Sequence, residues 1–167
     1  MVKWLSRIAV TAVLAAALWW GWQTFFPSDE RQIRRLLDHV AETASIPTDA
    51  KFVSGVLAAD RLQGYFTPQI EVDVEVPGEG RHTFTGREEL TQAYMLARSQ
   101  RRGLTVEFLD VIVAVGADHQ AATSELTARV RQTGQNDFGV QELRLQLRKV
   151  EDTWRINRIE TTRSIKL

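Results

Sequence analysis

The sequence predicts an α+β protein, in which three helices and about six mostly antiparallel strands follow an N-terminal transmembrane helix. Three observations lead to this prediction. Residues 8–26 contain no charged residue and no histidine. Between residues 29 and 101, apolar residues recur at helical spacing in three segments. From residue 104 onward, apolar and polar residues alternate as they do in half-buried strands.

Residues 8–26 have the length and composition of one membrane-spanning helix, since a bilayer requires ~20 apolar residues. Four of the five tryptophans lie toward the two ends of this stretch, where their rings favour the lipid headgroup region: Trp4 at one end and Trp19, Trp20 and Trp22 at the other. We therefore expect a short cytoplasmic N-terminus over residues 1–7, a transmembrane helix over 8–26 and one domain over 27–167. The lipid bilayer is then a partner of residues 8–26.

Two other interpretations of this stretch stay open. A signal peptide could be cleaved after the small residues Ala15–Ala17, and a buried core helix could also be apolar all round. Cleavage would leave an exposed aromatic segment at the new N-terminus, so an uncleaved anchor is favoured. Basic residues flank both ends and do not fix the orientation. The short N-terminal flank favours a single-pass protein of the inner (cytoplasmic) membrane, with its domain in the periplasm or outside the cell.

Composition excludes several classes of function. The chain has 21 basic and 21 acidic residues, a balance that gives no electrostatic footprint for nucleic acid. It has no cysteine, which excludes thiol chemistry and disulfides. The sequence contains no metal-ligand spacing, glycine-rich phosphate loop or nucleophile elbow, so we expect no metal and no cofactor.

The helical segments come before most of the strands. Ser28 is a suitable N-cap for the first helix, with Asp29 in the first turn where the helix dipole favours an acid. The helices are expected over residues 29–44, 49–66 and 87–101. A hairpin of strands 69–76 and 81–85 separates the second helix from the third.

Four more strands complete the predicted domain, over residues 104–115, 121–131, 138–150 and 154–162. The alternation changes phase near Asp110, which a β-bulge explains. The polar faces of the strands form a candidate interaction surface that contains Arg129, Arg131, Arg144, Arg148, Arg155 and Arg158. Such a surface is soluble and is also suited to docking a protein partner.

Three stretches resemble the nuclear transport factor 2-like superfamily, whose cone-shaped α+β fold is shared with ketosteroid isomerase and polyketide-cyclase-like proteins. They are TFTGREEL at residues 83–90, LDVIVAVGADHQAATSEL at 109–126 and TWRINRIE at 153–160. The resemblance implies a curved sheet around three helices, an apolar pocket, and a first strand beside the last. Glu71, Asp73 and Glu75 would then meet Arg155 or Arg158. This pairing is favoured over a metal site, because the three carboxylates are spaced too widely along a strand for one ion.

Enzymes of this fold place an Asp, His or Tyr inside the cone, and here Asp110 and Tyr94 are the candidates. The other candidate pocket residues are Tyr65, Phe66, Val72, Val74, Phe84 and Trp154. His82 and His119 are expected at a hairpin and a turn, in surface or turn roles. No pair of ionisable groups converges in the sequence pattern, so no catalytic residue is assigned.

The sequence therefore favours a non-enzymatic, membrane-anchored accessory or assembly subunit of a larger envelope complex. Its architecture is similar to that of the membrane-anchored assembly factors of type IV secretion systems, although no motif assigns the chain to them. The alternative is an isomerase, dehydratase or cyclase acting in the cone, or a binder of a lipid or small molecule. A homodimer through the sheet face is compatible with either hypothesis.

Overall fold

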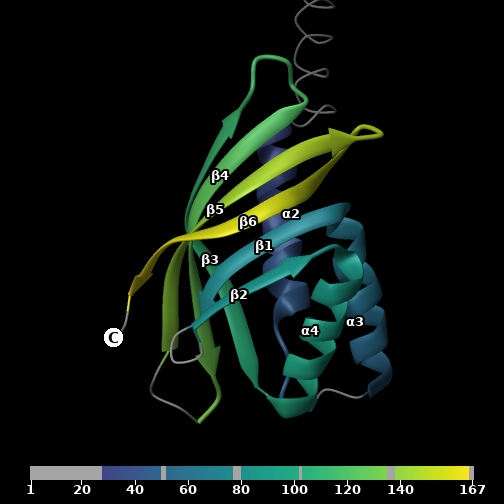
Figure 1. The fold of residues 1–167 in the computed structure, drawn as a ribbon, viewed down its shortest axis with the longest axis vertical. Helices are drawn as coiled ribbons and strands as arrows, with labels where there is room; N and C mark the ends of the chain where they lie inside the picture. Colours follow the sequence, from purple (N-terminus) through teal and green to yellow (C-terminus); the bar gives the residue numbers. More distant parts are fainter. Residues whose placement is uncertain (1–27, 50–51, 77–79, 102, 135–137, 166–167) are drawn as a thin grey trace, which may run out of the picture.

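The structure is a computed structural model that describes residues 28–49, 52–76, 80–101, 103–134 and 138–165 (Figure 1). The expected transmembrane helix and its four tryptophans lie outside these residues, so the membrane anchor stays a prediction. No helix within the described ranges is long and apolar enough to cross a membrane.

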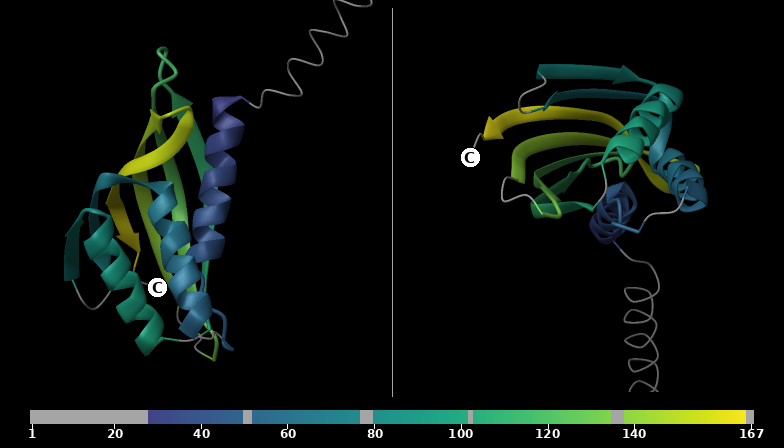
Figure 2. Two further views of the ribbon diagram at one scale, coloured as in Figure 1. Left: turned by 90° about the vertical axis from the view of Figure 1, so that its right-hand side faces the viewer. Right: turned by 90° about the horizontal axis from the view of Figure 1, so that it is seen from below.

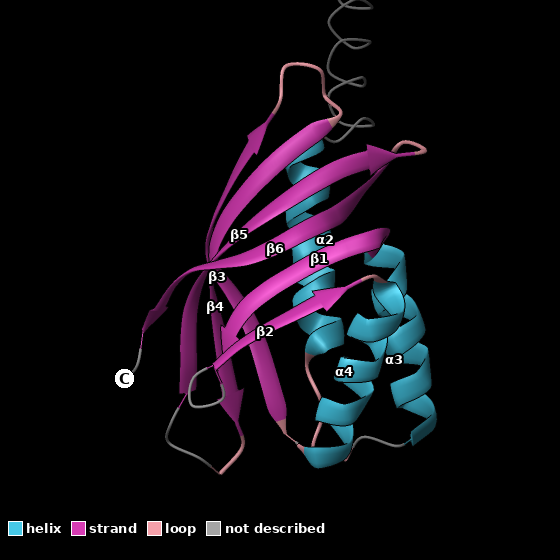
Figure 3. Cartoon of the chain, in the orientation of Figure 1, coloured by secondary structure: helices cyan, strands magenta, loops and turns pink. Residues whose placement is uncertain are grey.

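The domain is an α+β fold in which three helices pack on one six-stranded mixed sheet (Figure 3). The helices are α2 (Asp29–Ala44), α3 (Phe52–Tyr65) and α4 (Arg87–Gln100). The strands are β1 (Phe66–Val76), β2 (Gly80–Thr85), β3 (Leu104–Val115), β4 (Ala121–Gln132), β5 (Phe138–Val150) and β6 (Thr153–Ile165). The strand order is β2-β1-β6-β5-β4-β3, and only the β1–β6 pair is parallel. The first strand therefore lies beside the last, as the resemblance implies.

The sheet has an inner face that packs on the helices and an outer face that no described helix covers. Figure 2 shows the strands curving around one side of the helices. Helix α2 buries Ile33 and Leu37 against inward side chains such as Leu145 of β5 and Ile156 of β6. Burial of these apolar side chains is the main force that holds α2 on the sheet.

A β-bulge in β3 changes which face its side chains occupy. The pairing with β4 shifts by one residue between Leu109 and Ile112, and Asp110 has φ +53°. Phe108 and Val111 both pack on the core, whereas strict alternation would place them on opposite faces. The predicted bulge near Asp110 is confirmed.

Element boundaries differ from the sequence prediction at a few places. Phe66 is the first residue of β1 rather than the last of α3, so helix and strand meet directly. This early start follows from burial, because Phe66 is 4% exposed and aligns with Ile156 of β6. Ser28 occupies the N-cap of α2, but its hydroxyl accepts a hydrogen bond from Arg31 and caps no backbone N–H.

Candidate functional site

The inner face of the sheet holds most of the residues predicted to line a pocket. Phe66, Val72 and Trp154 are buried in the core. The partly buried members pack against them: Tyr65, Val74, Phe84 and Tyr94. The described part of the cone interior is thus predominantly apolar.

Tyr94 uses its hydroxyl to join two helices. The hydroxyl donates a hydrogen bond to the Thr43 carbonyl in the last turn of α2 (3.1 Å) and accepts one from Arg98 Nη1 (3.2 Å). Arg98 also donates to Ser54 Oγ of α3 (2.9 Å). These contacts satisfy a carbonyl at the end of a helix, where it has no partner in the helix itself. These hydrogen bonds explain the position of the Tyr94 hydroxyl by a structural role, without a catalytic one.

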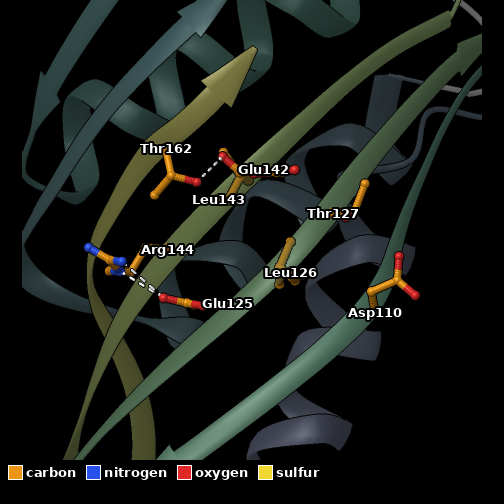
Figure 4. A pocket seen from close by; sticks show the side chains of 8 residues that line it. All are labelled: Asp110, Glu125, Leu126, Thr127, Glu142, Leu143, Arg144 and Thr162. Carbon is orange, nitrogen blue, oxygen red and sulfur yellow. Dashed lines mark hydrogen bonds and ion pairs between the residues drawn. The ribbon is translucent and has the colours of Figure 1, made fainter. Parts of the chain in front are cut away.

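Asp110 lies on the outer face, so the expectation that it points into the cone is wrong. The bulge turns its backbone into the left-handed region and leaves the side chain exposed to solvent. There it lines a hollow of ≈330 Å³ together with residues of β4, β5 and β6 (Figure 4). The helices lie behind the strands in this view.

The outer hollow is polar and mainly acidic. Its charged lining consists of Asp110, Glu125, Glu142 and Arg144, and Thr127 and Thr162 add hydroxyls. Arg144 donates to Glu125 Oε1 through Nε (3.2 Å) and Nη2 (3.0 Å), while Thr162 donates to the Glu142 carbonyl (3.1 Å). The lining thus carries three carboxylates and one guanidinium, which contacts Glu125, and this excess of acid is suited to receive a basic or hydrogen-bonding group.

A chain of ion pairs crosses four strands of the outer face. Arg144 contacts Glu125 at 3.0 Å and Glu160 at 3.6 Å. Arg158 contacts Glu160 at 3.4 Å and Glu71 at 2.8 Å. The contact between Arg158 and Glu71 is one that the resemblance implies. Opposite charges across strands contribute roughly 0.2–1 kcal/mol per pair, so this chain of contacts favours the observed register.

A second charged group joins β3 to β4 on the same face. Glu107 contacts Arg131 at 2.9 Å and accepts a hydrogen bond from Arg129 Nε at 2.8 Å. Hydrogen bonds from Arg131 and then Arg129 lower the pKa of Glu107. Four of the six predicted surface arginines are therefore neutralised within the molecule: Arg129, Arg131, Arg144 and Arg158.

Asp29 fastens the start of α2 to the sheet. Its Oδ1 accepts hydrogen bonds from Lys149 Nζ (2.8 Å) and Trp154 Nε1 (3.0 Å), and its Oδ2 lies 2.7 Å from His119 Nδ1. These hydrogen bonds, that of Lys149 above all, lower the pKa of Asp29 to about 2. The sequence gives Asp29 only a role in the first turn, because residues 90 or more positions away supply its partners.

The side chain of His82 lies on the inner face of the sheet, although the sequence predicts only a surface or turn role for it at a hairpin. It pairs with Val74, whose side chain faces the core, and its ring stacks on Phe84 with centroids 6.2 Å apart. The alternation of β1 places Val74 on the inner face. In a hairpin that pairs Val74 with His82, the two side chains lie on the same face of the sheet. That signal could have identified His82 as the histidine at the inner face.

A second hollow, of ≈440 Å³, lies between α2, the end of α3 and the start of β6. Tyr65, Leu36 and Trp154 line it, and Arg35, His39 and Asp152 add charged or polar groups.

The described residues contain no group of three potential metal ligands.

Comparison by sequence finds no matching protein family and no matching curated protein. Solved structures match over most of the chain. One is an NTF2-like protein with a cystatin-like fold from Novosphingobium aromaticivorans, 22% identical over 89% of this chain and 86% of its own, with a TM-score of 0.60. A protein from the same organism, named as a scytalone dehydratase, is 18% identical over 83% and 87% of the two chains, with a TM-score of 0.56.

The yeast UBP3-associated protein BRE5 is also similar. It is 14% identical to this chain, with a TM-score of 0.64 over 85% of this chain and all of its own (100%). Identities this low show the fold alone. The chain therefore has a fold similar to that of an NTF2-like protein with a cystatin-like fold, and its other structural neighbours include one named as an enzyme and one named for its association with another protein.

Proposed function

We propose that this protein is a non-enzymatic subunit of a larger envelope complex, anchored in the inner membrane by residues 8–26, with its domain in the periplasm or outside the cell. The domain binds protein partners through the outer face of its sheet. The observation that carries this proposal is the position of the polar groups. Asp110 and the acidic hollow lie on the outer face, while the hydroxyl of Tyr94 is engaged between two helices.

The outer face has properties that suit a docking surface. It combines the acidic hollow with exposed apolar area, since Ile112 beside the bulge is 64% exposed. Its ion pairs hold long side chains in defined positions, which reduces the entropy lost when a partner binds. The name of the yeast neighbour, a protein associated with another protein, is consistent with this class of function.

Exchanging two charges tests the proposal while retaining the Glu125–Arg144 ion pair, although the longer contact of Arg144 with Glu160 is lost. In the double variant Glu125→Arg/Arg144→Glu, the pair is retained but the charge pattern of the hollow is altered. The matched control is Asp60→Arg/Arg61→Asp, which exchanges two exposed charges on α3. Each chain carries a C-terminal tag and is recovered from native membranes in mild detergent, and the partners are identified by mass spectrometry.

We expect wild type and the α3 control to recover a defined membrane complex in stoichiometric amounts, and the Glu125/Arg144 exchange to lose it. Equal recovery by all three chains would refute a partner site at the hollow. Recovery of the wild type alone, as a monomer or homodimer by light scattering, would contradict the subunit proposal. It would favour the alternative, an enzyme or small-molecule binder of the cone, for which His82 is the residue to replace first.

A further inference from the structure

The arginines of the outer face fall into two groups. Arg129, Arg131, Arg144 and Arg158 each contact a carboxylate. Arg148 and Arg155 form no ion pair with any residue that the structure describes. Since every other predicted surface arginine is neutralised, this pair requires its own explanation.

Arg148 and Arg155 lie directly opposite each other on β5 and β6. Side chains at such positions start ~4.5–5.5 Å apart, and like charges there are destabilising. In addition, Nε of Arg155 is buried and has no hydrogen-bond partner among the described residues. A buried donor without an acceptor costs free energy, and an anion bound beside it would supply the acceptor. The pair is therefore arranged to receive an anion between the two side chains.

A third guanidinium lies near Arg155, because Arg87 bonds the carbonyl of Phe66, a residue that pairs with Ile156, the chain neighbour of Arg155. Arg87, the first residue of α4, donates through Nε to the Phe66 carbonyl (2.7 Å) and through Nη2 to the same oxygen. Burial, and then the charge of Arg155, lowers the pKa of Arg87. Arg87 likewise forms no ion pair within the described ranges. We call Arg87, Arg148 and Arg155 the arginine cluster.

We propose that the arginine cluster binds a phosphate group. The planar forks of Arg148 and Arg155 match phosphate oxygens in pairs of hydrogen bonds, and Arg87, whose Nε and Nη2 bond the Phe66 carbonyl, adds a third positive charge. Three positive charges without a counter-ion are also better balanced by a doubly charged phosphate than by a single carboxylate. Nothing in the proposed partner binding at the acidic hollow uses these residues, so the two proposals are independent.

The position of the cluster suggests two sources of phosphate. Lys149 and Trp154, the chain neighbours of Arg148 and Arg155, bind Asp29 in the first turn of α2. Successive residues of a strand point to opposite faces, so Arg148 and Arg155 lie on the outer face, across the sheet from the start of α2. If residues 8–26 cross a membrane, the phosphate of an anionic lipid headgroup lies toward this end of the sheet. Free inorganic phosphate is the other source.

The test measures anion binding by the full-length protein in dodecyl maltoside. Sodium phosphate is titrated calorimetrically against sodium chloride of matched ionic strength, for wild type and for Arg148→Gln/Arg155→Gln. The control is Arg129→Gln/Arg131→Gln, which removes two paired arginines from the same face. We expect the first variant to bind phosphate about tenfold or more weakly than wild type, and the control to bind it as wild type does.

Thermal unfolding in chloride separates binding from folding. The Arg148/Arg155 variant should melt at or above the wild-type temperature, because a like-charge contact has been removed. Should it fold poorly, Arg148→Lys/Arg155→Lys retains the charge but loses the fork and should still bind phosphate more weakly. A second probe, glycerophosphoglycerol, is the headgroup of phosphatidylglycerol without its acyl chains. Tighter binding of this probe than of phosphate assigns a lipid source, and the reverse assigns free phosphate.

Three results would overturn the proposal. The first is the absence of phosphate binding above chloride by wild type. The second is equal phosphate affinity in wild type and the Arg148/Arg155 variant. The third is conversion of a dimer to a monomer by that variant, without any response to phosphate, which would assign the cluster to carboxylates of a second copy. All three are measured on the isolated protein, so failure to recover a membrane complex does not affect them.

Discussion

Replacing Asp29 by asparagine tests how strongly the first turn of α2 is fastened to the sheet. The side chain is 14% exposed, and three groups from β5, β6 and the β3–β4 turn contact its carboxylate. Its pKa is lowered from 3.8 to about 2. At ~1.36 kcal/mol per pKa unit, this difference corresponds to roughly 2–3 kcal/mol of stability at neutral pH. We therefore expect Asp29→Asn to lower the free energy of unfolding by about 2 kcal/mol at pH 7.

The pH dependence identifies the charge as the cause. Because the pKa of Asp29 is lower in the folded than in the unfolded chain, its contribution is complete above about pH 5 and is lost as the pH falls through 3.8 toward 2. The difference in stability between wild type and Asp29→Asn should therefore shrink by roughly 1 kcal/mol at pH 3. Urea unfolding followed by far-UV circular dichroism measures both quantities.

Asp38→Asn is the matched control, since Asp38 is an exposed acid on the same helix. It should change the free energy of unfolding by less than about 0.5 kcal/mol. The reasoning would be refuted if Asp29→Asn lowered stability no more than this control. A constant difference from pH 7 to pH 3 would show that packing, rather than the charge, accounts for the loss.

Three further substitutions test the packing by urea unfolding at pH 7. Leu145→Ala removes a core side chain that is 1% exposed and should cost about 2–5 kcal/mol. Gly103→Ala places a Cβ 2.6 Å from Thr133 Oγ1 at φ +68° and should cost about 1–3 kcal/mol. Tyr94→Phe removes the hydroxyl that bonds the Thr43 carbonyl and should cost about 1 kcal/mol, with unchanged recovery of the complex. Loss of the complex in Tyr94→Phe at normal stability would instead indicate a direct role in function.

Local patterns in the sequence predict most of the fold. The strict alternation from Ile70 to Glu75 defines a strand with one apolar face, and Ile33 and Leu37 define the buried side of α2. The change of phase near Asp110 even predicts the bulge, because one additional residue moves all later side chains to the opposite face. These features depend on near neighbours in the chain, which a single sequence contains.

The candidate site is less predictable because it depends on contacts between distant residues. Tyr94 and Thr43 are 51 positions apart, and Asp29 and Trp154 are 125 apart. A helical or strand pattern specifies the face of a residue but not the group on the neighbouring element. The sequence therefore identifies Tyr94 as a hydroxyl on the buried face of its helix, but not the carbonyl that it bonds.

The bulge at Asp110 illustrates how one local feature decides on which face of the sheet an acid lies. With regular alternation from Phe108 to Ile112, Asp110 would share the inner face of Phe108 and supply the cone with an acid. The additional residue lets Val111 take the inner position and moves the carboxylate into the hollow with Glu125 and Glu142. The same change removes an acid from the interior and adds one to a surface suited to a protein partner. His82 remains an ionisable group on the inner face, which a hairpin register, rather than a motif, places there.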